Sequence, residues 1–277
     1  MIRIALSIAG SDSGGGAGIQ ADLKTFAAFG VFGATVLTAL TAQNTLGVRA
    51  VAEVAPPFVR AQLEAIREDF AVASAKTGML ARRPIIETVA THLRDRPLRS
   101  LVVDPVMVAA SGDLLLAPDA VAAMRELMLP LATVITPNVR EAEILSGVAI
   151  RDLPTMHRAA LTIVEMGAQA VLVKGGRLNE PNSVDVLCRG TAIREFKAPR
   201  IAVVRAHGTG CTLSAAIAAS MALGADLEAA VETAKNYVTR ALATAERVGH
   251  GATPLNRLVQ ANTAQIAGNS QTRRMPS

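Results

Sequence analysis

The sequence predicts an α/β protein whose central sheet is mostly parallel and is flanked by helices on both faces. Three observations support this prediction. Short apolar runs alternate with amphipathic stretches along nearly the whole chain, which is typical of successive β-α-β units. Several apolar runs end in glycine, aspartate or asparagine, residues that favour turns. The 277 residues are 51% hydrophobic and 18% charged, which is enough to bury a large core and excludes a disordered chain.

The first half of the chain begins with a short apolar run at 2–9, followed by a glycine-rich turn, which predicts a buried strand. Residues 18–29 carry apolar side chains at helical spacing. Residues 45–54 turn at Gly47, which predicts a hairpin or a small lid. Pro57 suits the first turn of a helix. The remaining predicted elements are strands at 34–42, 73–77 and 101–104 and helices at 57–70 and 84–93.

The second half repeats this rhythm, with an antiparallel pair of strands, 184–187 and 192–196, around Gly190. The two longest helical patterns, 210–223 and 227–248, close the chain. We expect a single domain over 1–260 and a polar, mobile tail over 261–277. The other predicted elements are helices at 117–129, 141–145 and 154–166 and strands at 133–136 and 170–173.

The composition excludes several classes of protein. The net charge of +5 is scattered, which favours solubility and an anionic ligand over nucleic-acid binding. Aromatic residues make up 3%, so stacking platforms for nucleic acid are not expected. Apolar runs are too short to cross a bilayer and no secretory signal is evident, so we expect a cytoplasmic protein without a membrane partner. Cys188 and Cys211 form no zinc-ligand pattern.

A glycine-rich loop at 10–18 follows the first strand and precedes a helix. Ligands of open α/β sheets bind beyond the carboxyl ends of the strands, so we expect the backbone N–H groups of this loop to face a ligand. A tight turn without a ligand is the simpler interpretation. The loop loosely matches a dinucleotide-binding pattern, but that pattern needs an acidic residue at the end of the second strand. This strand ends at Gln43, so a dinucleotide-binding loop is excluded. No P-loop motif is present, so any ATP is bound without one.

Hard oxygen ligands follow two other strands. Asp104 ends one strand, and Asn138 and Glu141 follow the next, three residues apart on the first turn of a helix. Together they predict a site for Mg²⁺ on a polyphosphate, because this ion needs few protein ligands. The simpler interpretations are a turn residue at Asp104 and a capping interaction between Asn138 and Glu141.

The segment 207–214, His-Gly-Thr-Gly-Cys-Thr-Leu-Ser, opens a long helix of small residues. Backbone N–H groups of residues 208–211 converge at a helix N-terminus, which predicts an anion hole for phosphoryl transfer. Cys211 lies where a thiol pKa is usually lowered, and we favour a functional role over a small buried hydrophobe. For Cys188 we favour the buried role. His207 is either a pocket residue or a cap.

At these residues the chain resembles the ribokinase superfamily and, within it, the hydroxymethylpyrimidine/phosphomethylpyrimidine kinases. The resemblance runs from Ile4 to about Asn256. Each motif alone is modest, but seven of them occur in order. They are residues 8–24, 41–48, 76–80, 103–107, 136–138 with Glu141, 173–176 and 207–214.

The resemblance implies ATP- and Mg²⁺-dependent phosphorylation of 4-amino-5-hydroxymethyl-2-methylpyrimidine and then of its monophosphate, in thiamine biosynthesis. It implies that Cys211 is the base, where most of the superfamily has aspartate, and that Gln43 pairs with the aminopyrimidine edge. The resemblance implies a substrate pocket lined by Gly10, Asp22 and Met79, and a nucleotide site at Lys174, Thr209 and Lys235. These positions join the predicted anion hole of Gly208, Thr209 and Gly210 and the predicted metal ligands Asp104, Asn138 and Glu141.

One segment departs from the family pattern. Residues 202–206 lack the polar and basic groups expected before the anion hole, and Arg205 is the only charge left. This segment leaves open a weakly catalytic protein that binds the pyrimidine. A pyridoxal or pyridoxine kinase of the same superfamily is the other alternative, because some of these resemble this chain in the Gly-Thr-Gly-Cys pattern. Superfamily members are often dimers, so a homodimer with an interface at 45–54 is also an option.

Overall fold

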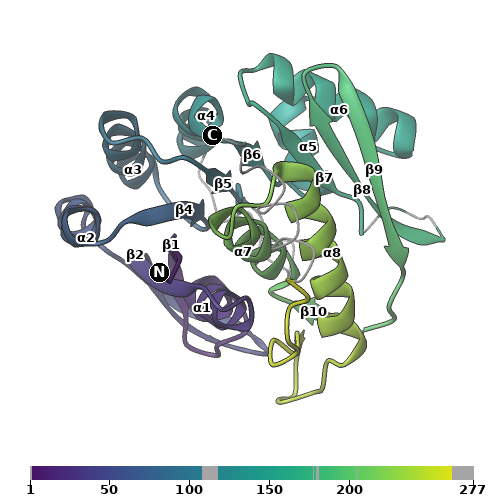
Figure 1. Ribbon diagram of the computed structural model, residues 1–277, viewed down its shortest axis with the longest axis horizontal. Coiled ribbons are helices and arrows are strands. Elements are labelled where there is room, and N and C mark those ends of the chain that lie inside the picture. Colours follow the sequence, from purple (N-terminus) through teal and green to yellow (C-terminus); the bar gives the residue numbers. More distant parts are fainter. Residues whose placement is uncertain (1, 108–117, 177, 179–180, 204, 264–277) are drawn as a thin grey trace, which may run out of the picture.

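The computed structural model of the protein describes residues 2–107, 118–176, 178, 181–203 and 205–263. Its centre is a nine-stranded sheet of order β3-β2-β1-β4-β5-β6-β7-β8-β9 (Figure 1). These strands are β1 (Ile4–Asp12), β2 (Phe32–Asn44), β3 (Gly47–Glu53), β4 (Val72–Thr77), β5 (Leu101–Val103), β6 (Val134–Ile135), β7 (Val171–Lys174), β8 (Asn182–Arg189) and β9 (Ala192–Pro199).

The sheet is parallel from β2 through β7 and antiparallel at its two ends. β3 pairs antiparallel with β2, so the predicted hairpin at 45–54 is confirmed. The predicted antiparallel pair in the second half is confirmed as β8 and β9. β1 pairs in parallel with both β2 and β4, so the chain order reverses between β1 and β4. The predicted fold class, a mostly parallel sheet with helices on both faces, is confirmed.

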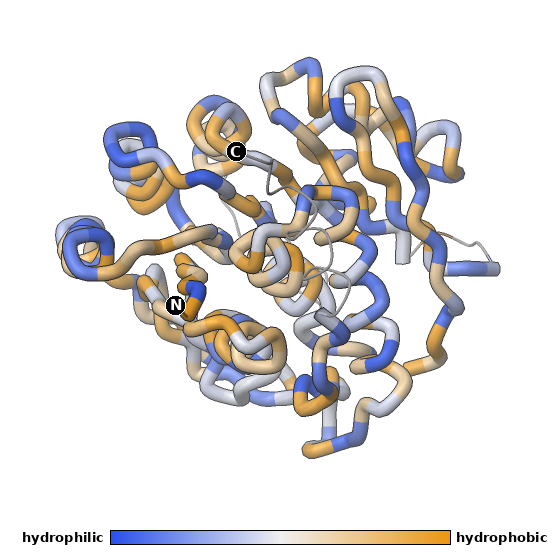
Figure 2. Tube along the Cα trace, in the orientation of Figure 1, coloured by the Kyte–Doolittle hydropathy of each residue, from blue (hydrophilic) through white to orange (hydrophobic). Residues whose placement is uncertain are grey.

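Helices cover both faces of the sheet. α1 (Gly18–Ala28), α7 (Thr209–Ala222) and α8 (Leu227–Ala243) enclose one hydrophobic core. α7 lies in the middle of this layer and is hydrophobic or neutral almost throughout (Figure 2). The helical segments of the opposite face are α2 (Pro56–Asp69), α3 (Arg83–Asp95), α4 (Pro118–Ala123), α5 (Val139–Ser146) and α6 (Leu153–Glu165).

Two predictions about helices need correction. The helix expected at 227–248 ends at Ala243, because the chain then turns back to pack on Thr45. A Cβ at Gly251 would lie 2.0 Å from the Thr45 carbonyl oxygen, so this approach requires glycine. The helix expected at 117–129 consists of α4, a π turn at Met124–Met128 and a 3₁₀ turn at Leu129–Leu131 containing Pro130, which cannot donate a backbone hydrogen bond.

A small second sheet was not predicted from the sequence. β10 (Ala206–His207) pairs in parallel with β11 (Thr253–Pro254), and two-residue strands carry no detectable periodicity. This small sheet joins the end of the unusual segment 202–206 to the segment around Thr253 near the C-terminus. Residue 204 of the unusual segment lies outside the described residues. Of the predicted tail, residues 264–277 lie outside the described residues. Among the helices described, none has the length and apolarity needed to cross a membrane.

Candidate active site

Asp104 lies just after β5 at the carboxyl edge of the sheet and is 2% exposed. One of its carboxylate oxygens accepts a hydrogen bond from the Lys174 Nζ, at the end of β7, at 2.9 Å. The other lies 3.3 Å from the Ser214 hydroxyl on α7. A Cβ at Gly210 would lie 3.0 Å from the Lys174 Nζ, so the start of α7 sits directly against this ion pair. The structure therefore brings together residues that are separated by up to 110 positions.

Asn138 and Glu141 form the capping box that was weighed as the simpler interpretation. The Asn138 side chain accepts from the Glu141 N–H at 3.0 Å, and Glu141 accepts from the Asn138 N–H at 2.8 Å. Burial raises the pKa of Glu141; the Lys174 ammonium opposes this rise and the Asp104 carboxylate adds to it. Two buried carboxylates therefore face one lysine. This donor set fits a hydrated Mg²⁺ contacted through its water molecules, since direct coordination by Asn138 would open the capping box.

The predicted anion hole is the first turn of α7. Gly208 caps the helix with a left-handed backbone, φ +81°, and its carbonyl accepts from the Thr212 N–H at 2.9 Å. In the described part of the chain, the N–H groups of Thr209, Gly210 and Cys211 have no acceptor. These three donors point out of a helix N-terminus beside Lys174. The turn is therefore free to receive an anion.

Cys211 differs from its prediction in one respect. Burial raises the pKa of its thiol, although the nearby Lys76 ammonium and the hydrogen bond from the Gly18 N–H act in the opposite direction. The expected lowering of its pKa at the start of α7 is therefore wrong: desolvation outweighs the helix N-terminus. Cys211 is a neutral thiol at pH 7. Its position between α7 and the N-terminus of α1 remains that of a group facing the anion hole.

Lys76 was not predicted as a site residue. Its side chain lies on β4 and forms an ion pair of 2.9 Å with Asp22 of α1, and both side chains are fully buried. The Ser7 hydroxyl on β1 donates to the same carboxylate at 2.6 Å. This pair lies at the point where the strand order reverses, the position where open α/β sheets bind ligands. A lysine inside a buried strand that is otherwise uncharged was the available signal.

The glycine-rich loop does not face a ligand as predicted. The Asp12 carboxylate accepts hydrogen bonds from the N–H groups of Gly14, Gly16 and Ala17 at 2.7–3.0 Å. Asp12 is nearly buried and also contacts the His207 Nε2 at 3.1 Å. Burial alone would raise the pKa of Asp12, but the hydrogen bonds from His207, Gly14 and Ala17 lower it. The three N–H groups of the loop therefore bind the Asp12 carboxylate. The expectation that the donors of the loop are free for a ligand is wrong for these three groups.

Gln43, near the end of β2, lies beside this loop. Its side-chain nitrogen is 3.2 Å from the His207 Nε2. His207 is not the cap of α7, which is Gly208; its side chain instead lies between Gln43 and Asp12. Gly10 is packed against Met79, whose methyl group would lie 2.7 Å from a Cβ at that position. The structure thus brings Gln43, Gly10 and Met79 to the same edge of the sheet. The Nζ of Lys76, the partner of Asp22, lies against Gly78, the residue before Met79.

Lys235 lies further away, on α8. Its ammonium is buried and pairs with the Asp185 carboxylate of β8 at 2.7 Å. The second oxygen of Asp185 accepts from the Gly175 N–H at 3.0 Å. Lys235 therefore supports the loop that follows Lys174 through Asp185. Cys188 is fully buried on β8, as expected.

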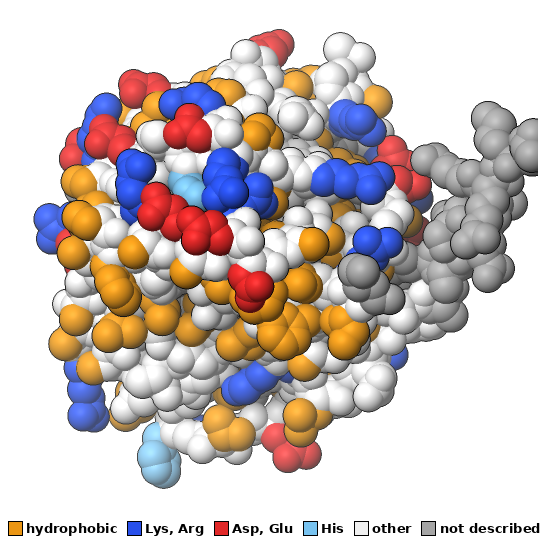
Figure 3. All heavy atoms as spheres, turned by 60° about the vertical axis from the view of Figure 1, so that its left-hand side comes forward, with side chains coloured by type: hydrophobic (Ala, Val, Ile, Leu, Met, Phe, Trp, Pro, Cys, Tyr) orange, Lys and Arg blue, Asp and Glu red, His pale blue; other side chains and the backbone are white. Residues whose placement is uncertain are grey.

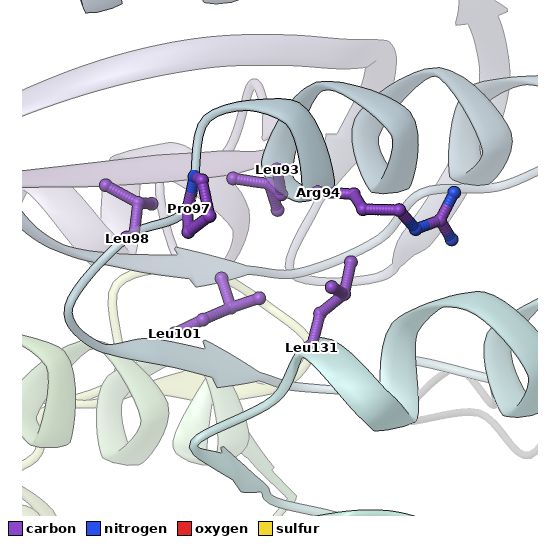
Figure 4. A pocket seen from close by; sticks show the side chains of 6 residues that line it. All are labelled: Leu93, Arg94, Pro97, Leu98, Leu101 and Leu131. Carbon is purple, nitrogen blue, oxygen red and sulfur yellow. The ribbon is translucent and has the colours of Figure 1, made fainter.

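Two hollows in the described surface contain none of the predicted site residues. One, of about 120 Å³, lies near the amino end of β5, where apolar side chains face one another and the Arg94 guanidinium extends away from them (Figure 4). The other, of about 380 Å³, lies between β9 and α8. Neither gathers titratable groups as the cluster around Asp104 does.

The comparison with protein families decides which family this arrangement represents. Residues 12–256 match the model of the phosphomethylpyrimidine kinases. The chain belongs to this family. A hydroxymethylpyrimidine/phosphomethylpyrimidine kinase of Rhizobium meliloti is 53% identical over 92% of this chain and 97% of its own length. A thiamine biosynthesis bifunctional protein of Geobacter sulfurreducens is 47% identical over 92% of this chain and 52% of its own length. The family and the kinase class predicted from the motifs are confirmed.

Solved structures of phosphomethylpyrimidine kinases and their relatives share the fold. Phosphomethylpyrimidine kinase from Clostridium difficile has a TM-score of 0.79 and 42% identity, over 87% of this chain and all of that one. Pyridoxal kinase from Bacillus subtilis, solved as an ADP complex, has a TM-score of 0.87 and 38% identity, over 94% and 98% of the two chains. Pyridoxal kinase activity, the alternative considered from the sequence, is therefore the named activity of a structural relative.

Proposed function

We propose that this protein transfers the γ-phosphoryl group of ATP to the hydroxyl of 4-amino-5-hydroxymethyl-2-methylpyrimidine and then phosphorylates the monophosphate, in thiamine biosynthesis. The observation that carries this proposal is the open first turn of α7 beside Lys174 and Cys211. The substrate oxygen forms a bond to the γ-phosphorus, the bond from that phosphorus to the β-phosphate oxygen breaks, and ADP leaves with the electron pair. The hydroxyl proton passes to the thiolate form of Cys211, which is the minor form at pH 7 and becomes the neutral thiol.

The nucleotide and its metal are assigned to the Asp104 side of the cluster. Lys174 supplies a positive charge beside the anion hole, and Thr209 supplies a backbone donor. Lys235 acts through Asp185. Mg²⁺ supplies charge neutralisation on the phosphates when bound, and Asp104, Asn138 and Glu141 would hold it through water.

A single pocket performs both phosphorylations in this proposal. The second acceptor is a phosphate monoester, already ionised at neutral pH because its second pKa is near ~6. It needs positive charge rather than a base. Lys24 is not used in this proposal, because its Nζ lies on the exposed side of the glycine-rich loop, where it donates to the Gly15 carbonyl at 2.9 Å. The support comes instead from Lys174 and the N–H groups of residues 209–211.

The decisive experiment is an assay of ADP release with the pyrimidine alcohol, its monophosphate and pyridoxal as separate acceptors. We expect turnover with both pyrimidines and little with pyridoxal. Turnover with pyridoxal alone would identify a pyridoxal kinase, the activity of the Bacillus subtilis relative. No turnover with any acceptor, together with pyrimidine binding, would favour the weakly catalytic pyrimidine-binding protein.

Gln43 is proposed to recognise the aminopyrimidine through hydrogen bonds, because its amide offers one donor and one acceptor to a ring nitrogen and the neighbouring amine. Replacing Gln43 with leucine is expected to reduce turnover of the pyrimidine far more than turnover of pyridoxine, since a site built to hydrogen-bond a substrate discriminates strongly when its polar group is lost. The measurement is kcat/KM for both alcohols. Equal losses would assign Gln43 to the support of His207, which it contacts at 3.2 Å.

A homodimer through β2 and β3 is the proposed assembly. Hydrophobic side chains gather across the middle of the face that carries these strands and α2, at the left of Figure 1 (Figure 3). Contiguous exposed apolar surface of this kind marks an interface. The large exposed hydrophobic residues of β2, β3, the turn between them and α2 are Phe32, Leu40, Leu46, Val48, Val51 and Phe58, each 45–68% exposed.

The test is the molar mass in solution by light scattering. We expect a dimer for the unmodified protein and a monomer for Val51→Asp, because a charge at the centre of an apolar interface is costly to bury. Ile193→Asp on β9, at the opposite edge of the sheet, is the matched control and should remain dimeric. A monomeric unmodified protein, or dissociation by both substitutions, would contradict an interface at β2 and β3.

A further inference from the structure

Arg257 follows β11 near the end of the described chain, and its side chain is 5% exposed. Its Nε donates to the Thr212 hydroxyl at 2.8 Å. Its Nη2 donates to the Gly16 carbonyl at 2.7 Å and lies 3.3 Å from the Gly208 carbonyl oxygen. One buried guanidinium therefore joins the glycine-rich loop to the first turn of α7, the proposed anion hole.

The two backbone segments held by Arg257 are in direct contact. A Cβ on Gly208 would lie 1.9 Å from the Gly16 carbonyl oxygen and 2.4 Å from an Arg257 nitrogen. Two carbonyl oxygens thus converge on one guanidinium, whose planar fork can donate to several acceptors in fixed directions. Without it, the carbonyl of the buried Gly16 would lose this donor, while the Gly208 carbonyl would keep its hydrogen bonds from Thr212. The spacing between the loop and α7 depends on this side chain.

The charge of Arg257 has no direct counter-ion. No salt bridge within the described residues involves it, and its hydrogen-bond acceptors are carbonyl and hydroxyl oxygens. Asp12 and Asp22 act on it electrostatically from a greater distance. Burying a cation without a paired anion is costly. An anion bound at the first turn of α7 would provide the missing compensation.

We propose that Arg257 is a positioning residue for phosphoryl transfer. It fixes the Gly16 and Gly208 carbonyl groups, so that the N–H groups of residues 209–211 stay aimed at the transferred phosphoryl group, and it places a positive charge behind them. This inference rests on the proposed kinase function. It assigns a role to a residue that touches neither substrate, since its guanidinium is enclosed by the loop, Thr212 and Gly208.

The test compares Arg257→Ala and Arg257→Lys with the unmodified enzyme in kcat, KM and melting temperature. Arg257→Ala is expected to lower kcat by about 10- to 100-fold, the range for groups that orient a contacting group. KM for the pyrimidine should change little, because Gln43 and Met79 are not contacted. Added guanidinium ion should restore part of kcat in Arg257→Ala. Arg257→Lys keeps the positive charge but loses the planar guanidinium, so its kcat should lie between those of Arg257→Ala and the unmodified enzyme.

Arg67→Ala is the matched control. Arg67 on α2 also donates to backbone carbonyls, those of Arg96 and Pro97 at 3.1 and 3.4 Å, but at the opposite edge of the sheet. Its kcat should be unchanged and insensitive to guanidinium. Loss of kcat in Arg257→Ala without rescue, or full activity in both Arg257 variants, would overturn the proposal.

Two further outcomes are separated by the design. If Arg257→Ala does not fold, Arg257→Lys decides: reduced kcat at an unchanged melting temperature supports positioning, and unchanged kcat overturns it. If the unmodified enzyme phosphorylates pyridoxal rather than the pyrimidine, the proposed substrate is wrong. The same series is then measured on pyridoxal, where the expected fall in kcat and its rescue are identical.

Discussion

Cys211→Ala is expected to lower kcat for the pyrimidine alcohol by about 10²- to 10⁴-fold, the usual range for loss of a general base. A primary alcohol must lose its proton as the bond to phosphorus forms. Cys211 lies at the first turn of α7, against the Gly18 N–H and within the field of the Lys76 ammonium. The affinity for ATP should change little, because Lys174 and the N–H groups are retained. Single-turnover and steady-state rates with the alcohol measure the effect.

The monophosphate provides the internal control for this substitution. Its acceptor oxygen is already ionised, so Cys211→Ala should reduce the second phosphorylation less than the first. Equal losses on the two acceptors, or a greater loss on the monophosphate, would mean that Cys211 acts through the geometry of the anion hole. Activity of Cys211→Ala equal to that of the unmodified enzyme would exclude the thiol as the base.

The pH dependence follows from the raised pKa of the Cys211 thiol. Below that pKa the thiol is protonated, so the fraction able to accept a proton rises with pH. We expect kcat for the alcohol to increase with pH, with a midpoint above the ordinary pKa of a thiol, because burial raises the pKa of Cys211. The increase should be absent in Cys211→Ala. A midpoint below the ordinary value in the enzyme-substrate complex would contradict desolvation as the dominant influence.

Lys76→Met is expected to destabilise the protein by about 3–5 kcal/mol, the cost of leaving a buried charge without its partner. Asp22 is fully buried, and after the substitution only the Ser7 hydroxyl would remain to stabilise its carboxylate. The free energy of unfolding, measured by urea denaturation, tests this expectation. The double variant Asp22→Asn with Lys76→Met should recover much of the loss, because neither charge is then buried.

The loss caused by Lys76→Met should also depend on pH. Burial raises the pKa of Asp22 above its ordinary value, and the Lys76 ammonium opposes this rise, so the pKa of Asp22 is higher still in Lys76→Met. A carboxyl group whose folded-state pKa is raised costs stability as the pH rises above its unfolded pKa of ~3.9, since the unfolded chain then ionises more readily. The destabilisation should therefore be smaller at pH 5 than at pH 7. The same destabilisation at both values would mean that Asp22 stays ionised in the folded variant.

Much of the fold follows from local patterns in the sequence. Apolar runs and helical spacing predicted the elements of the parallel sheet, and the rule that parallel strands end at one edge predicted that Asp104 lies near Asn138 and Glu141. Elements governed by distant contacts were not predictable in this way. The end of α8 depends on Thr45, 206 positions before Gly251. Local spacing carries no information about such contacts.

The candidate site shows the same division. The open turn at 208–211 was predicted, because its glycines and the following helix are adjacent in sequence. The capture of the loop donors by Asp12 was missed, since a glycine-rich loop looks the same whether its N–H groups face a ligand or a side chain. Arg257 gave no local signal, and its partner Gly16 lies 241 positions away. The pKa of Cys211 was misjudged because burial cannot be read from a helix position.

The scarcity of aromatic residues gives the protein an optical property of its own. It has no tryptophan and one tyrosine, so its intrinsic emission comes from a single ring, Tyr237 on α8. That ring is buried edge-on against Phe29, with centroids 5.1 Å apart. Its hydroxyl donates to the backbone carbonyl of Arg257 at 3.2 Å. Tyrosine fluorescence therefore reports, without any label, on the segment that ties the end of the chain to the first turn of α7.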